Sequence, residues 1–523
     1  MIDRFGRPSR PSTFAIIAMT ASIVANMAAA PMVFAVPTTN AVSSELPARF
    51  SLTLAQRDEI EEVLTGIAQD IVSNQERMDG QGIISSPVVR FSEDGKSLIV
   101  DLGKGYVPKI NGGELEDRLR EIETPLTFHM EAIFPVYKVE FLFGGRDIYY
   151  YFPEDWRPAP SQWRQEPRSG QLRPHTNSVL VSAGHGIYFH RGYKDWRAAR
   201  EPANGMTEDF ITPVMSADLA TYLNDRSEVE SVLVRSQALV THAESGSPWW
   251  KVSARYHLKE LYPALTDVWN SKGTQDYPLV ERDDDIYSRP FFANHLGVDA
   301  ILHVHTNAES NTSIRGARVY YQTGRVPDSE LARSSLFYMA ESIHSVPGYE
   351  DYPVASAPHE GNYAENREAK MISVIAEVGF HTNPLDAAAL QDPAFQKAAM
   401  RGFEKGYRLF LAQKPLQKFE IVDHPNVEAK PGESVPVEAH FSGYPRFPVS
   451  RESSVLSCPE GWTCSGGTQT LAETESPFVT MASCGASNVE AGTTRSQVVF
   501  TDADGLSTTT EYELHCTGRD MRH

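Results

Sequence analysis

Four residues that can bind a metal ion or move a proton stand at the ends of predicted strands or at the start of a predicted helix. His185 follows the apolar run Ser178–Ala183, Glu208 opens a helical pattern, and His305 and Glu377 lie in two further apolar runs. Histidine and carboxylate ligands with one open position are the set that a catalytic zinc ion requires. A carboxylate near such an ion can act as a general base and later protonate a leaving amine. The pattern therefore predicts a catalytic zinc site.

Each of these residues also has an interpretation without chemistry. His303 and His305 share one face of their predicted strand, because side chains alternate, and only His305 reaches the carboxyl edge. We therefore choose His305 as a ligand and expect His303 to be a packed histidine next to the site. A carboxylate buried in an apolar strand, as at Glu377, can instead be paired with an arginine, since an unpaired buried charge is costly. Glu208 can simply be an acidic residue in the first turn of a helix, where such residues are favoured.

Strand and helix patterns alternate from residue 178 to about 413, which predicts an α/β domain with a largely parallel sheet and helices on both faces. The expected strands are 178–183, 232–234, 300–305, 319–321 and 372–378, and the expected helices are 207–224, 327–344 and 393–411. Open sheets of this kind bind ligands at their carboxyl edge. The segment 236–288, with Trp249 and Trp250, interrupts the alternation and is expected to be a large insertion.

The first 35 residues have the composition of a secretory signal peptide. Arg4, Arg7 and Arg10 precede an apolar, alanine-rich run with small residues at its end. Cleavage is expected after Ala35, with residues 28–30 as the alternative, and an uncleaved anchor is the less favoured outcome because Pro31 interrupts the run. The protein is therefore expected in the periplasm or outside the cell, with no stable membrane insertion after cleavage.

The chain of 523 residues is too long for one domain. Residues 50–153 are expected to form a small α+β recognition or regulatory module, with a helix over 54–74, strands over 87–91 and 97–102, a helix over 113–122, and a hairpin of 136–143 with 147–152. Residues 154–177 contain several prolines and are expected to be a linker. The net charge of -20, without a lysine and arginine cluster, argues against a nucleic-acid partner.

Short strand patterns after residue 414 predict an immunoglobulin-like β-sandwich over 418–520. All four cysteines lie in this region, and an even number in an exported module suggests disulfides. Three pairings are possible. We favour Cys458–Cys464 with Cys484–Cys516, because the first pair closes a short loop. A zinc site from the four cysteines is the alternative, although their spacing does not form two close knuckles.

The central region resembles the zinc-dependent N-acetylmuramoyl-L-alanine amidases of the third amidase family. The motifs occur in family order over 178–413: Ala-Gly-His-Gly at 183–186, a glutamate at a helix start, RPFFAN at 289–294, ILHVHTNA at 301–308 and AEVGFHTNP at 376–384. The resemblance implies an α/β, phosphorylase/hydrolase-like fold in which helices flank a central, mostly parallel six-stranded sheet. It also implies a Zn²⁺ cofactor and hydrolysis of the amide between N-acetylmuramic acid and L-alanine in peptidoglycan.

The family motifs also assign roles by position. They make His185, Glu208 and His305 the zinc ligands and Glu377 the catalytic carboxylate. Arg289, Asn294 and Asn307 match family positions that are expected to shape the site. Among the remaining histidines, His381 is the best candidate for a substrate contact, because it directly follows the Glu377 strand. The chain departs from the family after Gly186, where residues 187–207 look longer than usual, so Glu201 and Asp209 are rivals to Glu208.

The insertion has two interpretations: it can cover the site until an activator protein displaces it, or it can build the substrate groove. Its two tryptophans can stack on sugar or anchor the insertion. Two other functions are the alternatives to a muramyl amidase. One is a zinc peptidase acting on cell-wall peptides, and the other is a wall-binding protein without turnover.

Overall fold

The computed structural model describes residues 52–131, 133–156, 177–486 and 490–518. The predicted signal peptide lies outside the described residues, as do residues 157–176 of the predicted linker. The chain divides into two compact units, with the boundary between Arg157 and Pro158. No helix among the described residues is long and apolar enough to cross a membrane.

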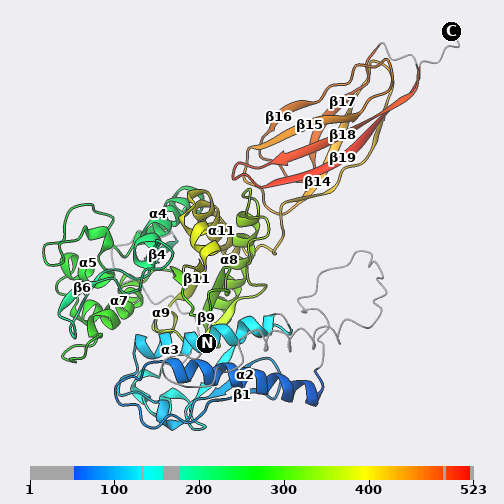
Figure 1. Cartoon of the computed structure of the whole chain (residues 1–523). Coiled ribbons are helices and arrows are strands. Elements are labelled where there is room, and N and C mark those ends of the chain that lie inside the picture. Colours follow the sequence, from blue (N-terminus) through cyan, green and yellow to red (C-terminus); the bar gives the residue numbers. More distant parts are fainter. Residues whose placement is uncertain (1–51, 132, 157–176, 487–489, 519–523) are drawn as a thin grey trace, which may run out of the picture. The chain divides into compact units, whose positions relative to one another are not determined.

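The N-terminal unit packs two helices against a small sheet (Figure 1). Helix α2 (Leu54–Asn74) begins at Thr53, whose side chain and Gln56 form a reciprocal cap. The sheet has the order β1-β2-β3. The remaining elements are β1 (Val88–Phe91), β2 (Leu98–Asp101), η1 (Lys104–Tyr106), α3 (Gly113–Glu131), β3 (Val139–Leu142), η2 (Ile148–Tyr150) and η3 (Pro153–Asp155).

The hairpin expected over residues 136–152 is wrong. Strand β3 pairs in parallel with β2, and residues 148–150 form a 3₁₀ turn that the Asp147 carboxylate caps by accepting the Tyr150 N–H. The Gly144 and Gly145 N–H groups donate to the carboxylate of Asp101. This anchor turns the chain away from a hairpin, and no periodic pattern in the sequence signals it.

The centre of the second unit is a sheet of six strands in the order β10-β9-β11-β8-β4-β7. Its pairs are parallel except for β9 with β11, which is antiparallel, so the predicted six-stranded, mostly parallel sheet is confirmed. The short edge strand β10 escapes sequence analysis. The strands are β4 (Ser178–Ala183), β7 (Glu230–Leu233), β8 (Ala300–Asn307), β9 (Arg318–Gln322), β10 (His359–Gly361) and β11 (Ile372–Phe380).

The two faces of this sheet have different partners. Val179 and Val181 of β4 and Leu302 and Val304 of β8 belong to the larger apolar core. This core is covered by helices α4 (Glu208–Arg226), α8 (Val326–His344) and α11 (Pro393–Leu411). Leu180 and Ile301 point the other way, toward α5 (Ala254–Leu261) and α7 (Val280–Leu296), because side chains alternate along a strand. His303 and His305 share this second face. Both strands are buried throughout, as expected for parallel strands covered on both sides.

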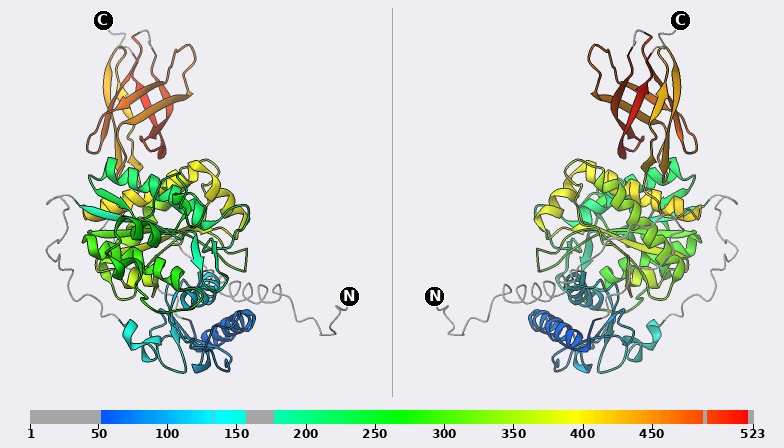
Figure 2. Two further views of the ribbon diagram at one scale, coloured as in Figure 1. Left: turned by 90° about the vertical axis from the view of Figure 1, so that its left-hand side faces the viewer. Right: turned by 90° about the vertical axis from the view of Figure 1, so that its right-hand side faces the viewer.

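The helices lie on both sides of the sheet (Figures 1 and 2), and α11 packs along α8. Helix α11 begins after Asp392, which caps it, with Pro393 at its first position. The elements outside the central sheet are β5 (Tyr188–His190), β6 (Asp195–Arg197), α4 (Glu208–Arg226), η4 (Trp249–Lys251), α5 (Ala254–Leu261), α6 (Thr266–Trp269), α7 (Val280–Leu296), α8 (Val326–His344), α9 (Ala364–Arg367), α10 (Pro384–Gln391) and α11 (Pro393–Leu411).

The expected insertion ends inside α7, so its last residues belong to the helix that carries Arg289. In the sequence, the acidic residues of that stretch are typical of an exposed loop. In the structure they are buried, and their carboxylates form hydrogen bonds and ion pairs. The Asp285 carboxylate accepts the Arg255 N–H and lies 3.0 Å from the Arg289 guanidinium. The remainder, with Val252, Ala254 and Leu258, contributes to the buried core of the domain.

The C-terminal region forms two sheets around one apolar core. The sheets have the orders β12-β14-β17 and β13-β19-β18-β15-β16. Their kinship with immunoglobulin domains stays a prediction, whereas the favoured cysteine pairing is present, with Cys458 joined to Cys464 and Cys484 to Cys516. The strands are β12 (Glu420–Asp423), β13 (Val427–Ala429), β14 (Ser434–Ser442), β15 (Val449–Ser457), β16 (Gly467–Leu471), β17 (Phe478–Ser483), β18 (Gly492–Thr501) and β19 (Ser507–Cys516).

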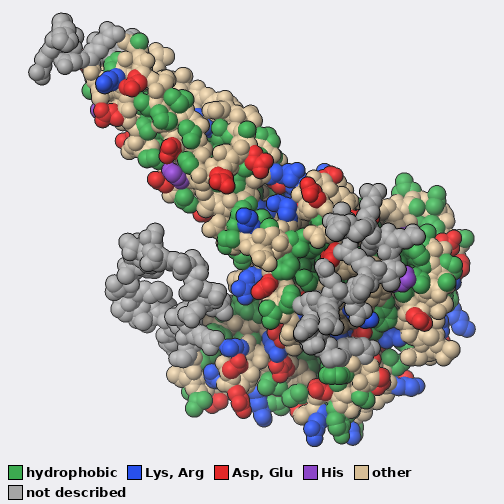
Figure 3. Space-filling model, turned by 180° about the vertical axis from the view of Figure 1, so that it is seen from behind, with side chains coloured by type: hydrophobic (Ala, Val, Ile, Leu, Met, Phe, Trp, Pro, Cys, Tyr) green, Lys and Arg blue, Asp and Glu red, His purple; other side chains and the backbone are tan. Residues whose placement is uncertain are grey.

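Charged side chains of both signs are mixed on the face of the molecule drawn in Figure 3. That face shows no continuous basic stripe among the described residues, which agrees with the acidic composition.

The two disulfides are expected to stabilise the C-terminal region unequally. Replacement of Cys484 and Cys516 by serine opens a loop with a sequence separation of 32, whereas the Cys458–Cys464 pair closes one of only 6. Chain entropy predicts losses of about 4 and about 2 kcal/mol in the free energy of unfolding. Urea unfolding of the two double variants measures the difference, and free thiols in the oxidised native protein would contradict the pairing.

Candidate metal centre and active site

The carboxyl edge of the sheet brings two histidines together. His185 directly follows β4, and His305 lies near the end of β8, the strand paired with β4. Their ring centroids are 4.8 Å apart. Gly184 permits this approach, because a Cβ atom at that position would overlap the His305 ring. The glycine before His185 is therefore required by the neighbouring strand as well as by the turn.

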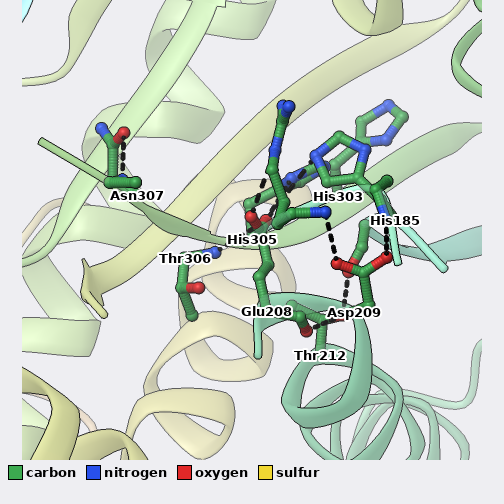
Figure 4. A network of polar contacts seen from close by, with 12 residues as sticks. His185, Glu208, Asp209, Thr212, His303, His305, Thr306 and Asn307 are labelled. Carbon is green, nitrogen blue, oxygen red and sulfur yellow. Dashed lines mark hydrogen bonds and ion pairs between the residues drawn. The ribbon is translucent and has the colours of Figure 1, made fainter. Parts of the chain in front are cut away.

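Helix α4 supplies the carboxylate between these rings, since Glu208 is its first residue. Glu208 Oε1 lies 2.9 Å from His305 Nδ1 and 3.8 Å from His185 Nε2 (Figure 4). The same oxygen accepts the Thr306 N–H at 3.2 Å, and Oε2 lies 3.6 Å from Nε of Arg200. All three side chains of the cluster are buried.

The two rivals to Glu208 lie elsewhere. Asp209 is fully buried, but its carboxylate accepts the backbone N–H groups of Gly186, Ala199 and Arg200 at 2.7–3.1 Å. Glu201 is exposed. Consecutive residues of α4 thus have separate tasks: Glu208 faces the histidines, and Asp209 holds the extended loop that leaves His185.

The chemistry of the donor set fits a divalent cation. His185, Glu208 and His305 each offer one ligand atom, and these atoms lie within 4.8 Å of one another. His185 Nε2 is buried and has no hydrogen-bond partner among the described residues. A buried ring nitrogen without a hydrogen-bond partner is costly unless it receives a ligand. Two imidazoles and one carboxylate form a ligand set of the kind that holds catalytic zinc.

The charges at the cluster have identifiable causes. Burial and the nearby charge of Arg200 hold the pKa of His185 well below its usual value, so this ring is neutral. Burial opposes a charge on His305, yet the carboxylates of Glu365 and Glu208 raise its pKa to about 9. Burial likewise opposes ionisation of Glu208, but the hydrogen bond with His305 lowers its pKa. In the metal-free protein a proton on His305 thus supplies positive charge that a bound cation would replace.

Glu377 lies beside this cluster on β11. It is directly paired with His305 on β8 in the parallel register, and it is also paired with Arg318 on β9. Residues paired across neighbouring strands share a face and lie about 5 Å apart. The Glu377 side chain is fully buried. Its place next to His305 fits a proton-transfer role, and its register with Arg318 also matches the arginine-paired interpretation.

Sequence analysis missed one carboxylate, Glu365 of α9. It lies 2.6 Å from the Arg289 guanidinium, 2.9 Å from His303 Nδ1 and 3.1 Å from His305 Nε2. Burial opposes its charge, but Arg289 and the two histidines hold its pKa well below the usual range. Glu365 stands in a polar stretch without periodicity, so no sequence signal distinguishes it from an exposed acid.

The residues expected to contact substrate are buried around the cluster. Arg289 is fully buried, and its Nη2 lies 3.2 Å from His185 Nδ1. The Asn307 side chain accepts the Ala308 N–H and lies apart from the rings in Figure 4. His381 Nδ1 lies 2.9 Å from the Thr306 hydroxyl. Their roles toward substrate stay predictions.

The segment after β7 approaches the loop that bears His185. Ile187 forms a bridge with Val252, and a Cβ atom at Gly186 would meet the Ser253 backbone. Gly186 has a φ of 124°, a conformation that favours glycine. The tryptophan pair stands in the turn η4, where Trp249 contacts the ring of His242 and Trp250 that of Phe210.

Gly184→Ala is expected to displace the His305 ring and to weaken metal binding by at least about tenfold, because ligands held out of position cost affinity. Gly66→Ala is the matched control, since nothing lies within 4 Å of the added Cβ and Gly66 belongs to the N-terminal unit. Competition with a zinc chelator measures both variants. Unchanged affinity in the Gly184 variant would remove His305 from the metal centre.

Comparison with known proteins identifies the central region. Residues 179–406 match the family model described as N-acetylmuramoyl-L-alanine amidase. No curated protein matches the chain significantly.

Among solved structures, the catalytic domain of the amidase CwlV from Bacillus (Paenibacillus) polymyxa is 18% identical, covering 46% of this chain and 100% of that one with a TM-score of 0.30. The CwlD amidase of Clostridioides difficile, solved in complex with the GerS lipoprotein, is 15% identical, with 46% and 100% coverage and a TM-score of 0.33. Ami1 from Mycobacterium smegmatis is 16% identical, with 46% and 98% coverage and a TM-score of 0.30. On the strength of the family match, residues 179–406 form a domain of the N-acetylmuramoyl-L-alanine amidase family.

Proposed function

We propose that the protein is an exported zinc amidase that hydrolyses the amide bond between N-acetylmuramic acid and L-alanine of peptidoglycan. The observation that carries the proposal is the buried set of His185, Glu208 and His305, with Glu377 paired to His305, inside a domain of the amidase family. We assign His185, Glu208 and His305 as zinc ligands and Glu377 as the catalytic carboxylate.

The residues around the cluster divide the work of hydrolysis. A bound zinc ion supplies a Lewis acid that polarises the scissile carbonyl and acidifies water. The Glu377 carboxylate takes the proton of the attacking water and returns it to the nitrogen of L-alanine as the amide bond breaks. Glu208 and the two histidines hold the cation, while Asp209 fixes the loop after His185 through its three backbone hydrogen bonds.

Removal of the catalytic carboxylate is expected to lower turnover with the fold intact. Glu377→Gln should reduce the release of free L-alanine amino termini from sacculi on the order of 10²–10⁴-fold, the usual contribution of a general base. Glu201→Gln, which changes an exposed carboxylate, is the control and should keep full activity. Mass analysis of sacculus digests measures both variants. Full activity of the Glu377 variant would refute its role.

The substrate class is tested by the same analysis. A muropeptide should be cleaved and the corresponding free peptide should not, because the scissile amide joins the peptide to muramic acid. Equal cleavage of both would favour a zinc peptidase, and sacculus binding without turnover would favour a wall-binding protein.

Zinc content provides a separate test of the ligand set. The purified protein should hold one zinc ion, and dialysis against a chelator should abolish activity that added zinc restores. Glu208→Gln should lose stoichiometric zinc, since an anionic ligand is replaced by a weak neutral one. Glu201→Gln should retain it. Full zinc occupancy in the Glu208 variant would exclude this carboxylate as a ligand.

The flanking regions and the insertion complete the proposal. For the N-terminal and C-terminal regions the alternatives are wall binding, recruitment of a partner and covering of the site. We assign residues 236–279 to the groove or to the docking of an activator protein. Residues 236–279 contact the loop that bears His185 through Val252 and Ser253, and this contact supports their assignment. The CwlD amidase of Clostridioides difficile was solved in complex with a protein partner, the GerS lipoprotein.

A further inference from the structure

Glu365 lies at a junction of three elements. Its carboxylate, in α9, contacts His303 and His305 of β8 and Arg289 of α7, and its residue is only 5% exposed. None of the family motifs in the sequence includes it. A carboxylate charge is costly to bury without partners, so the position of Glu365 against the two histidine rings requires a physical explanation.

The orientation of the His305 ring supplies that cause. Nδ1 of the ring lies 2.9 Å from Glu208 Oε1, whereas Nε2 lies 3.1 Å from Glu365 Oε2. A neutral imidazole that gives one nitrogen to a metal carries its proton on the other and needs an acceptor there. We propose that Glu365 is the positioning residue that accepts the His305 Nε2–H and thereby directs Nδ1 to the metal. The proposal rests on the metal centre of the proposed function.

The same residues admit a different use, as a second metal site. One ligand atom each from His303, His305 and Glu365 lies within 4.8 Å of the others. Such a site would place a second cation against the fully buried Arg289 guanidinium, which lies 2.6 Å from Glu365 Oε1. It would also require His305 to give both ring nitrogens to metals. Repulsion between the two positive charges therefore favours one metal with Glu365 outside its ligand set.

The surroundings of α9 keep Glu365 in place. The Asn294 side chain donates to the Glu368 carbonyl and accepts the Lys370 N–H, both at 2.8 Å. Asn366 donates to the Tyr320 carbonyl at 3.3 Å and accepts the Ser373 hydroxyl at 2.7 Å. These bonds tie the segment to α7, β9 and β11, so the carboxylate is held before a metal arrives. Preorganisation of this kind is what an outer partner of a metal ligand requires.

The test measures zinc affinity by chelator competition and the visible spectrum of the cobalt-substituted protein, neither of which depends on turnover. Glu365→Ala should weaken zinc binding about 10–100-fold, as is usual when the partner of a ligating histidine is lost, and should alter the cobalt spectrum. Glu365→Gln keeps an acceptor oxygen for the Nε2–H and should lose less affinity than the alanine variant. Glu360→Gln is the matched control, because this carboxylate of β10 bonds Tyr321 instead, and it should bind zinc like the wild type.

The outcomes separate the inference from the function on which it rests. If Glu365→Ala binds zinc as tightly as the wild type, Glu365 does not position His305, although the metal centre stands. Two zinc ions in the wild type and one in the variant would establish the second metal site and overturn the inference. Absence of zinc binding in the wild type would overturn the metal centre itself. Should the alanine variant fail to fold, Glu365→Met gives the decision, because it keeps a similar volume without an acceptor oxygen, and wild-type affinity and spectrum there would refute the inference.

Discussion

A carboxylate that leaves water must find positive or hydrogen-bonding partners, and this constraint governs Glu208 and Glu365 together. Burial opposes the charge on both residues, yet neighbouring cations lower the pKa of each. Their partners come from α7, β8 and the loop that holds Arg200. Since α4 and α9 supply the two acids, the cluster is satisfied only when all these elements have packed. Formation of the centre and folding of the domain are therefore one event.

The sheet meets this constraint by keeping its two faces distinct. One face is an apolar layer under α4, α8 and α11, which supplies most of the buried hydrocarbon. The other carries His303, His305 and Glu377 in register with Arg318. The same alternation of side chains in β8 that places Leu302 and Val304 in the core thus delivers both rings to the polar face. One face of β8 thus contributes to stability, and the opposite face contributes the residues of the candidate site.

Much of this arrangement could be predicted because it rests on local patterns. Continuous apolar runs identify β4, β8 and β11, since parallel strands covered on both faces contain few polar residues. The histidines stand out within or directly after those runs, and Glu208 opens an amphipathic helix. Glu365 could not be predicted, because its partners come from α7 and β8 and only the fold brings them together. The acidic start of α7 resembles a loop for a similar reason: its carboxylates are satisfied by distant groups, among them the Arg255 and Lys272 N–H groups.

The two faces of the sheet also evolve under different rules. Hydrocarbon side chains in the larger core can exchange for others of similar volume one at a time, at modest cost. On the polar face, loss of Glu365 would remove one of the two carboxylates paired with Arg289, and loss of Arg289 would remove the guanidinium that Glu365 and Asp285 share. Effects of such substitutions do not add, because each residue's value depends on its partners. Drift on that face must therefore proceed in matched sets, so the identities of residues 289 and 365 are expected to vary together among descendants of this chain.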